Sequence, residues 1–182
     1  MKFAEIMKQL GIETYCEFSA EMMVPEERIR AFCAQNKCGN YGGNYMCQPA
    51  VGSIEEVKAK LGNFQQGVLL QYAKYLDVKN DRKGAIQVQK DFHSKILQIE
   101  DFLSEKGIRP VWGMIGGNCR LCDECRAKTG EPCVNPDKAR MSLEAIGIDV
   151  LGLLDKLGLD NKFHADKITW TGCILIQEQK IS

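Results

Sequence analysis

The chain has 182 residues, and its 24 lysine and arginine residues balance its 24 aspartate and glutamate residues. This balance gives no reason to expect a nucleic acid or an anionic membrane as a partner. Apolar residues make up 45% of the chain, which is enough for a hydrophobic core in one domain and argues against general disorder. The longest apolar runs span only a few residues, far short of the ~20 that a membrane-crossing helix needs.

The first third of the chain is predicted to form two helices and one short strand. Apolar residues recur over residues 2–10 as on an amphipathic helix, and Gly11 ends it. A signal peptide would need a continuous apolar stretch, which this segment lacks, so we expect a cytoplasmic protein. Residues 14–23 favour a short strand. A second helix begins at Pro25, because proline suits the first helical position and two glutamates follow it.

The middle of the chain carries the clearest local signals. Ser53 and Glu56 have the spacing of a capping box, which predicts a helix that runs to about Leu61. Residues 67–76 begin with apolar residues on both alternating faces, as in a central strand. Residues 83–105 repeat apolar residues at steps of three and four, which predicts the longest helix.

The last third is predicted to alternate strands and helices. Residues 108–115 favour a strand, which leads into the main cysteine cluster. A helix is expected to include Pro136 and residues 139–146, and an aspartate caps a short helix over residues 150–157. Residues 168–177 alternate in the manner of a final strand.

These elements predict one domain over residues 1–182. Strands alternate with helices, so we expect the α/β class, with α+β as the alternative. The expected architecture is a small sheet covered by helices. Two cysteine-rich metal-binding loops, at about residues 33–49 and 116–136, are expected to lie together at one end.

The strongest chemical signal is a cluster of four cysteines in the second loop. Cys119, Cys122, Cys125, Cys133 and Pro136 form the pattern C-x2-C-x2-C-x7-C-x2-P. Bacterial ferredoxins use the C-x2-C-x2-C run for a [4Fe–4S] cluster, with a further cysteine that precedes a proline. Zinc also accepts four thiolates, but it usually takes them from two separated pairs. The triple spacing therefore favours an iron–sulfur cluster, with zinc as the alternative.

Two glycines precede this cluster and are candidate cofactor-binding residues. Gly116 and Gly117 would let the backbone pass close to a cluster. We expect their N–H groups to be free to bond the cluster sulfurs, an interaction that tunes the reduction potential.

The first loop carries three further candidate ligands. Cys33, Cys38 and Cys47 flank or lie in a segment rich in glycine and asparagine that has no helical or strand period. Long irregular loops in compact domains are usually functional or disordered, and a metal would give this one rigidity. The structural alternative is one core cysteine, Cys33, and two incidental loop thiols. A phosphate-binding loop is disfavoured, because the known glycine-rich patterns are absent.

The remaining cysteines and the two histidines are interpreted as structural. Cys16 and Cys173 lie in predicted strands, where a cysteine is most simply a small buried hydrophobe. His93 and His164 are each isolated, so we expect surface or boundary residues and not ligands. Nine cysteines without a secretion signal indicate metal ligands or redox groups, not a disulfide framework.

Together, the two cysteine segments resemble a bacterial and archaeal family of predicted metal-binding proteins, classed as a domain of unknown function. Its members carry C-x(n)-C…Y-G…C-P-P, then C-x2-C-x2-C…C-x2-P, and then a segment like S-x-E-A-x-G-I-D-V. The matching positions are Cys33, Cys38, Tyr41, Gly42, Cys47, Pro49, residues 119–136 and residues 142–150. Gln48 stands where the family tends to have proline. The resemblance covers roughly residues 25–177 and implies metal or iron–sulfur binding, with no settled reaction.

The number of sites stays open at this point, because the two segments hold seven cysteines and two complete four-cysteine sites need eight. In the first arrangement, the downstream cysteines hold one cluster, and Cys33, Cys38 and Cys47 hold a second metal. The last coordination position of that second metal is open or filled by Cys16 or another group. Alternatively, Cys133 completes the upstream site, as the fourth cysteine does in two-cluster ferredoxins. The third arrangement is a single cluster.

Three functions are compatible with this pattern. The first is an electron-transfer or redox-accessory protein with one or two [4Fe–4S] clusters and a redox partner protein. The second is a zinc-binding structural or interaction module. The third is an enzyme whose incompletely ligated cluster binds or reduces a small molecule. The first is favoured over the third, since no recognisable nucleotide or cofactor loop accompanies the cysteines.

Overall fold

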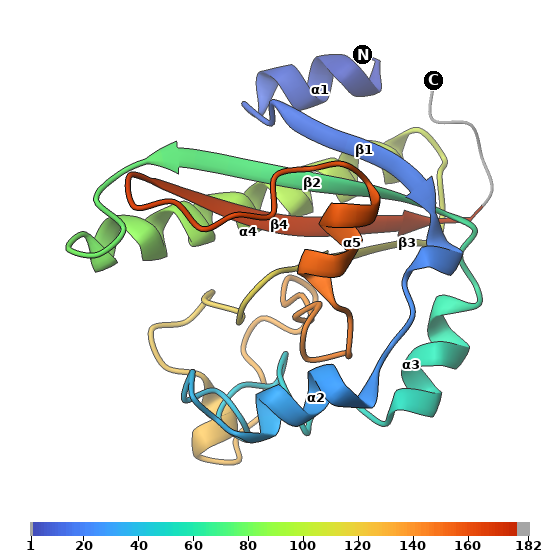
Figure 1. The fold of residues 1–182 in the computed structure, drawn as a ribbon. Helices are drawn as coiled ribbons and strands as arrows, with labels where there is room; N and C mark the ends of the chain where they lie inside the picture. The colour runs from blue at the N-terminus through green and yellow to red at the C-terminus, as the bar shows by residue number, and fades with distance from the viewer. Residues whose placement is uncertain (1, 178–182) are drawn as a thin grey trace.

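The centre of the molecule is an antiparallel sheet. The structure, a computed structural model, describes residues 2–177. The sheet has four strands in the order β1-β2-β4-β3 (Figure 1). The strands are β1 (Thr14–Ser19), β2 (Gln66–Tyr75), β3 (Val111–Ile115) and β4 (Lys167–Ile176). The mixed α/β class and the four predicted strands are confirmed, and antiparallel pairing replaces the parallel sheet that strict β-α alternation would give.

Helices occupy both sides of this sheet. They are α1 (Phe3–Gln9), α2 (Glu27–Ala34), α3 (Ile54–Leu61), α4 (Arg82–Glu105) and α5 (Val150–Lys156), with short 3-10 turns η1 (Ala20–Met22) and η2 (Arg126–Lys128). The predicted capping box is confirmed: the Glu56 N–H donates to Ser53 Oγ at 3.2 Å, and the Ser53 N–H donates to the Glu56 carboxylate at 2.7 Å. Asp149 caps α5 by accepting the Gly152 N–H at 2.9 Å.

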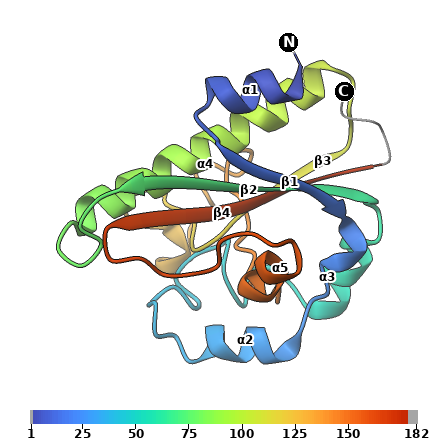
Figure 2. The same cartoon turned by 45° about the horizontal axis from the view of Figure 1, so that its top comes forward.

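The sheet separates two hydrophobic cores. α1 and α4 pack against one face, and α3, α5 and residues 139–148 pack against the other (Figures 1 and 2). The central strands are buried on both faces, as their continuous apolar runs require. Leu69 and its partner Cys173 belong to one core, whereas Val68 and its partner Ile174 belong to the other.

The two cysteine loops lie next to each other at the end of α2, to its left in Figure 1, and the downstream loop also contacts α4 through Gln89. Lys128 of the downstream loop lies close to Gly43 of the upstream loop. A Cβ atom placed on Gly43 would be 3.6 Å from Lys128 Cγ. No disulfide is present among residues 2–177, where all nine cysteines are free thiols. Within the same residues, none of the helices combines the length and apolar character that crossing a bilayer requires.

The predicted helix over residues 139–146 is wrong. The segment instead runs as turns along β3, where the Ile115 N–H donates to Met141 O at 3.0 Å and the Leu143 N–H donates to Ile115 O at 2.8 Å. β3 is an edge strand with unpaired backbone groups, and these take up the hydrogen bonds that a helix would have kept internal. Leu143 and Ile146 are buried all the same, which explains the apolar spacing.

Two smaller expectations also differ from the structure. The apolar side of α2 is not a core face: none of its residues is buried, and Phe32 is 62% exposed. His93 was predicted at the surface or a boundary, but it is buried in α4, with its Nε2 2.9 Å from Lys138 O. Burial lowers the pKa of His93, because the charged imidazolium would lose its hydration.

Candidate metal centre

The four downstream cysteines line one pocket. Cys119, Cys122, Cys125 and Cys133 are all half-buried there, although Cys133 follows Cys125 by eight positions. Asn44, Tyr45 and Met46 of the upstream loop line the same pocket. The structure thus places Cys133 beside the other three downstream thiols, as both the first and the third of the arrangements that the sequence left open would have it.

These thiols surround the pocket without meeting at one point. Its volume is about 20 Å³, and within residues 2–177 no three cysteine, histidine, aspartate or glutamate side chains are close enough to hold one metal ion. Four thiolates on zinc would stand ~3.8 Å apart, given zinc–sulfur bonds of about 2.3 Å in a tetrahedron. A [4Fe–4S] cluster needs its four thiolates farther apart than a zinc ion does. The donor set of four thiols suits either group.

A buried asparagine holds the two cysteine loops together. The Asn44 side-chain amide donates to Cys119 O at 2.9 Å, and its carbonyl accepts the Met46 N–H at 3.0 Å. Next to it, the Tyr45 hydroxyl donates to Glu131 O at 2.7 Å. The upstream loop therefore supports the backbone on both sides of the triple-cysteine run.

Helix α4 supports the start of the same run. The Gln89 side-chain amide donates to Asn118 O at 2.9 Å and accepts the Arg120 Nε–H at 2.6 Å. Because α4 is long and packed on the sheet, it gives the first cysteine a rigid neighbour.

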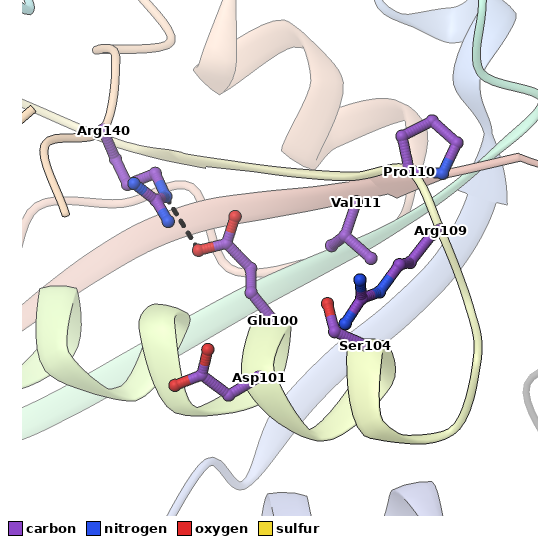
Figure 3. A pocket seen from close by; sticks show the side chains of 7 residues that line it. All are labelled: Glu100, Asp101, Ser104, Arg109, Pro110, Val111 and Arg140. Carbon is purple, nitrogen blue, oxygen red and sulfur yellow. Dashed lines mark hydrogen bonds and ion pairs between the residues drawn. The ribbon is translucent and has the colours of Figure 1, made fainter. Parts of the chain in front are cut away.

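A second contact from α4 holds the segment after Cys133. Arg140 Nε lies 2.7 Å from the Glu100 carboxylate, and both side chains are largely buried (Figure 3). Arg140 also donates to Asp137 O at 2.8 Å, while Glu100 accepts the Gly113 N–H of β3 at 2.8 Å. This ion pair therefore ties the segment that follows the fourth cysteine to a helix and a strand.

Hydrogen-bond donors already surround the thiols. Burial raises the pKa of Cys119, while backbone hydrogen bonds from Leu121 and Arg140 act in the opposite direction by favouring the thiolate. The Asn135 side-chain amide lies 3.4 Å from Cys122 Sγ as a donor. Donors of this kind stabilise sulfur ligands that carry negative charge.

The two glycines predicted to bind a cofactor already use their backbone N–H groups in hydrogen bonds within the protein. The Gly116 N–H donates to Thr171 O at 2.7 Å, and the Gly117 N–H donates to the Glu144 carboxylate at 3.1 Å. Neither is the free donor that the sequence analysis expected. The reason is tertiary: β4 and the segment after β3 supply acceptors that no local pattern reveals.

The upstream thiols form a second group, together with a carboxylate. Burial foremost, together with the nearby thiols of Cys38, Cys33 and Cys119 and the carboxylate of Glu144, raises the pKa of Cys47 to about 12. Burial and Glu144 likewise raise the pKa of Cys33, whereas Arg30 opposes them. A group of acidic side chains that disfavour one another's ionisation is suited to a cation, which would remove the repulsion.

Glu144 is a candidate site residue that the cysteine spacing does not indicate. Its carboxylate also accepts the Ser142 hydroxyl at 2.8 Å, so it is held in place beside the upstream thiols. The only sequence signal for it is its position as the glutamate of the S-x-E-A segment. Cys16 and Cys173 lie apart from both groups, on β1 and inside the sheet, where Cys173 Sγ is 3.6 Å from Met23 Sδ.

The family model "Predicted metal-binding protein (DUF2284)" matches residues 16–176, which include both groups of thiols. The chain belongs to this family. The resemblance inferred from the cysteine spacing is therefore confirmed at the level of the family. No curated protein and no solved structure matches the chain. For a DUF2284 protein, a metal cofactor in general is supported, and the two thiol groups are its candidate ligands.

Proposed function

We propose that this DUF2284 protein is an iron–sulfur protein that carries a [4Fe–4S] cluster on Cys119, Cys122, Cys125 and Cys133. The observation that carries the proposal is that these four thiols line one pocket, with the C-x2-C-x2-C spacing typical of such clusters. When bound, the cluster supplies one-electron redox chemistry. The remaining contribution comes from the residues around it.

The surrounding residues would hold the thiolates and set their charge. The N–H groups of Leu121 and Arg140 at Cys119 and the Asn135 amide at Cys122 offset the negative charge of the sulfurs. Such hydrogen bonds raise the reduction potential of a cluster. Asn44 and Tyr45 cover the pocket from the upstream loop and limit the access of water to it.

We propose further that Cys33, Cys38 and Cys47, with Glu144 as a fourth donor, hold a second metal centre. Support comes from the shared electrostatic environment of the four groups. A centre with mixed thiolate and carboxylate donors exchanges ligands more easily than a four-thiolate centre, so it suits the binding of a small molecule. This second centre is the specific feature that favours an enzyme as the alternative to simple electron transfer.

In the cell, the role proposed is that of an electron-transfer or redox-accessory protein for a partner protein in a reducing cytoplasm. Support comes from nine free cysteines in a chain of balanced charge. A zinc-binding structural module remains the alternative that the first experiment separates.

The test is the content of iron, sulfide and zinc per chain, with the visible spectrum, in protein purified without oxygen. About four irons with equal sulfide support one cluster, and about eight support two. Cys122→Ser is expected to lose the visible absorbance of its cluster, whereas the control Cys16→Ser keeps it. A colourless protein with stoichiometric zinc would overturn the redox function in favour of a structural module.

A further inference from the structure

A large cavity opens beside the upstream thiols. It has a volume of about 860 Å³ and lies between α2, α5, residues 160–164 and β4. Its wall is mainly apolar and includes Phe32 of α2, Leu151 of α5 and Phe163. These three side chains are exposed, although residues of this type are usually buried. Cavities of this size with apolar walls and a few polar groups are the usual form of small-molecule sites.

One wall is the unpaired edge of β4. β3 ends at Ile115, which pairs with Gly172, so among residues 2–177 no strand continues beside residues 167–171 on that side. At this edge, the backbone hydrogen bond seen among residues 2–177 runs from the Gly116 N–H to Thr171 O. All five residues from Lys167 to Thr171 line the cavity. The edge of a strand offers backbone donors and acceptors to whatever lies beside it.

One polar atom of this wall lacks a partner. Within residues 2–177, three buried side-chain nitrogen or oxygen atoms make no hydrogen bond, and one of them, Thr169 Oγ1, belongs to a β4 residue on the same face of the sheet as Cys173, the face of the cavity. Native structures rarely leave buried polar atoms unsatisfied. The Trp170 indole lies on the other face, where it packs in the core under α4 with Tyr72. The Thr169 hydroxyl can donate or accept, so it calls for a polar group on the occupant.

The charges around the cavity favour an anion. Arg28 is neutralised by ion pairs that include Asp149 at 2.8 Å, and Lys167 is paired with Asp160 at 3.2 Å. Lys37 and Lys162 also line the cavity, and neither forms an ion pair within the part of the chain that the structure describes. Glu144 also lines the cavity, and no ion pair of it is seen within the described residues. The four lining cations (Arg28, Lys37, Lys162 and Lys167) therefore exceed the three lining carboxylates (Glu144, Asp149 and Asp160) by one, and Lys37 and Lys162 are free to attract a negatively charged group.

We propose that this cavity binds a small apolar organic acid, with an aromatic or branched hydrocarbon body and one carboxylate or similar anionic group. The body would lie against Phe32 and Leu151, and the anionic group would be attracted by Lys37 and Lys162. A polar atom of the acid would satisfy the Thr169 hydroxyl. Cys33, Cys38 and Glu144 line the same cavity, so a bound acid lies against the second thiol group. The inference concerns binding and does not depend on which metal is present.

The experiment compares two fluorescent probes on protein purified without oxygen. Anilinonaphthalene sulfonate is an aromatic anion, and N-phenylnaphthylamine has the same rings without the charge; both brighten in apolar surroundings. We expect saturable binding of one anionic probe per chain and weaker binding of the neutral probe.

Three variants locate the bound probe. The double variant Lys37→Ala, Lys162→Ala should weaken the anionic probe about tenfold and leave the neutral probe nearly unchanged. Thr169→Val keeps the shape of the side chain but removes the hydroxyl, so it should weaken the anionic probe about fivefold. Phe32→Ala should weaken both probes. The controls are Lys8→Ala on α1, across the sheet, and Tyr75→Ala, which is exposed outside the cavity.

The proposal is overturned if the two probes bind the wild type equally well, if binding does not saturate, or if the cavity variants behave like the controls. Thermal unfolding of Thr169→Val shows whether that variant is folded. Iron analysis is a separate measurement. If a protein without iron binds the probe, the acid site is supported and the redox function is overturned. If a protein with iron does not bind the probe, the redox function is supported and the acid site is overturned.

Discussion

The side-chain amide of Asn44 donates a hydrogen bond to the carbonyl oxygen of Cys119 at 2.9 Å, across 75 positions of sequence. Asn44 is only 3% exposed, so this bond has no water to replace it. It joins the two cysteine loops directly at the first residue of the triple-cysteine run.

Asn44→Ala is therefore expected to destabilise both the fold and the metal centre. The variant leaves the Cys119 carbonyl and the Met46 N–H without their partner, which costs about 1–3 kcal/mol. We expect a lower midpoint of thermal unfolding and faster loss of metal to a chelator. Asn63→Ala, an exposed asparagine that bonds only within its own helix end, is the matched control. Equal behaviour of the two variants would argue against a role of Asn44 in joining the two cysteine loops.

The ion pair between Glu100 and Arg140 is expected to matter more than the surface pairs. Its side chains are 11% and 18% exposed, and Glu100→Ala leaves Arg140 with an uncompensated charge in a largely buried place. We expect a loss of about 2–4 kcal/mol in the free energy of unfolding. Glu124→Ala removes the exposed pair with Lys128 and should cost less than about 1 kcal/mol. Chemical denaturation of both variants checks the difference.

Asp160 gives a prediction for the pH dependence of stability. Hydrogen bonds from the Lys162 N–H, His164 and Lys167 hold the pKa of this carboxyl at about 2, below its usual 3.8. A carboxyl with a depressed folded pKa stabilises the protein above the unfolded pKa, and this contribution is lost as the pH falls from about 4 towards 2.

Asp160→Asn should therefore lower the unfolding midpoint at pH 6, and the gap to wild type should close between about pH 4 and 2. Thermal unfolding across this range measures the gap. A gap that is the same at pH 6 and pH 2 would show that the side chain acts through packing and not through its charge.

Removal of the metal should expose the cysteines to alkylation in a defined order. In the metal-free protein, the exposed Cys38 should react first, since it is the most accessible candidate ligand. Cys47 should react slowly, because a pKa of about 12 leaves little thiolate at neutral pH. Cys173 is fully buried, and burial raises its pKa, so it should react only on unfolding. Mass spectrometry of timed samples gives the order, and rapid labelling of Cys47 would contradict it.

The same protein with its metal bound is the comparison. Thiols that act as ligands should be protected until a chelator is added, whereas Cys16, which lies on β1 apart from both groups, should react at the same rate with and without metal. Protection of Cys119, Cys122, Cys125 and Cys133 but not of Cys33 and Cys38 would restrict the metal to the first group.

Local patterns in the sequence determined most of the elements. The Ser53 capping box, the apolar stripe of α4, the two-sided apolar run of β2 and the alternation in β4 each specify a structure through neighbours in the chain, so they could be interpreted without the fold. The cysteine spacing is local in the same sense, and it was sufficient to indicate a metal-binding family.

Only the tertiary structure decided the rest, because the deciding partners are distant in sequence. Residues 139–146 form no helix, since the edge of β3 takes their hydrogen bonds. Gly116 and Gly117 donate to β4 and to Glu144, which leaves them unavailable to a cluster. The gathering of Cys133 with Cys119, the place of Glu144 beside Cys33 and the cavity along β4 arise in the same way. Chain segments that are far apart in the sequence lie together in the fold, and the candidate ligands and the cavity are formed by residues from several of these segments.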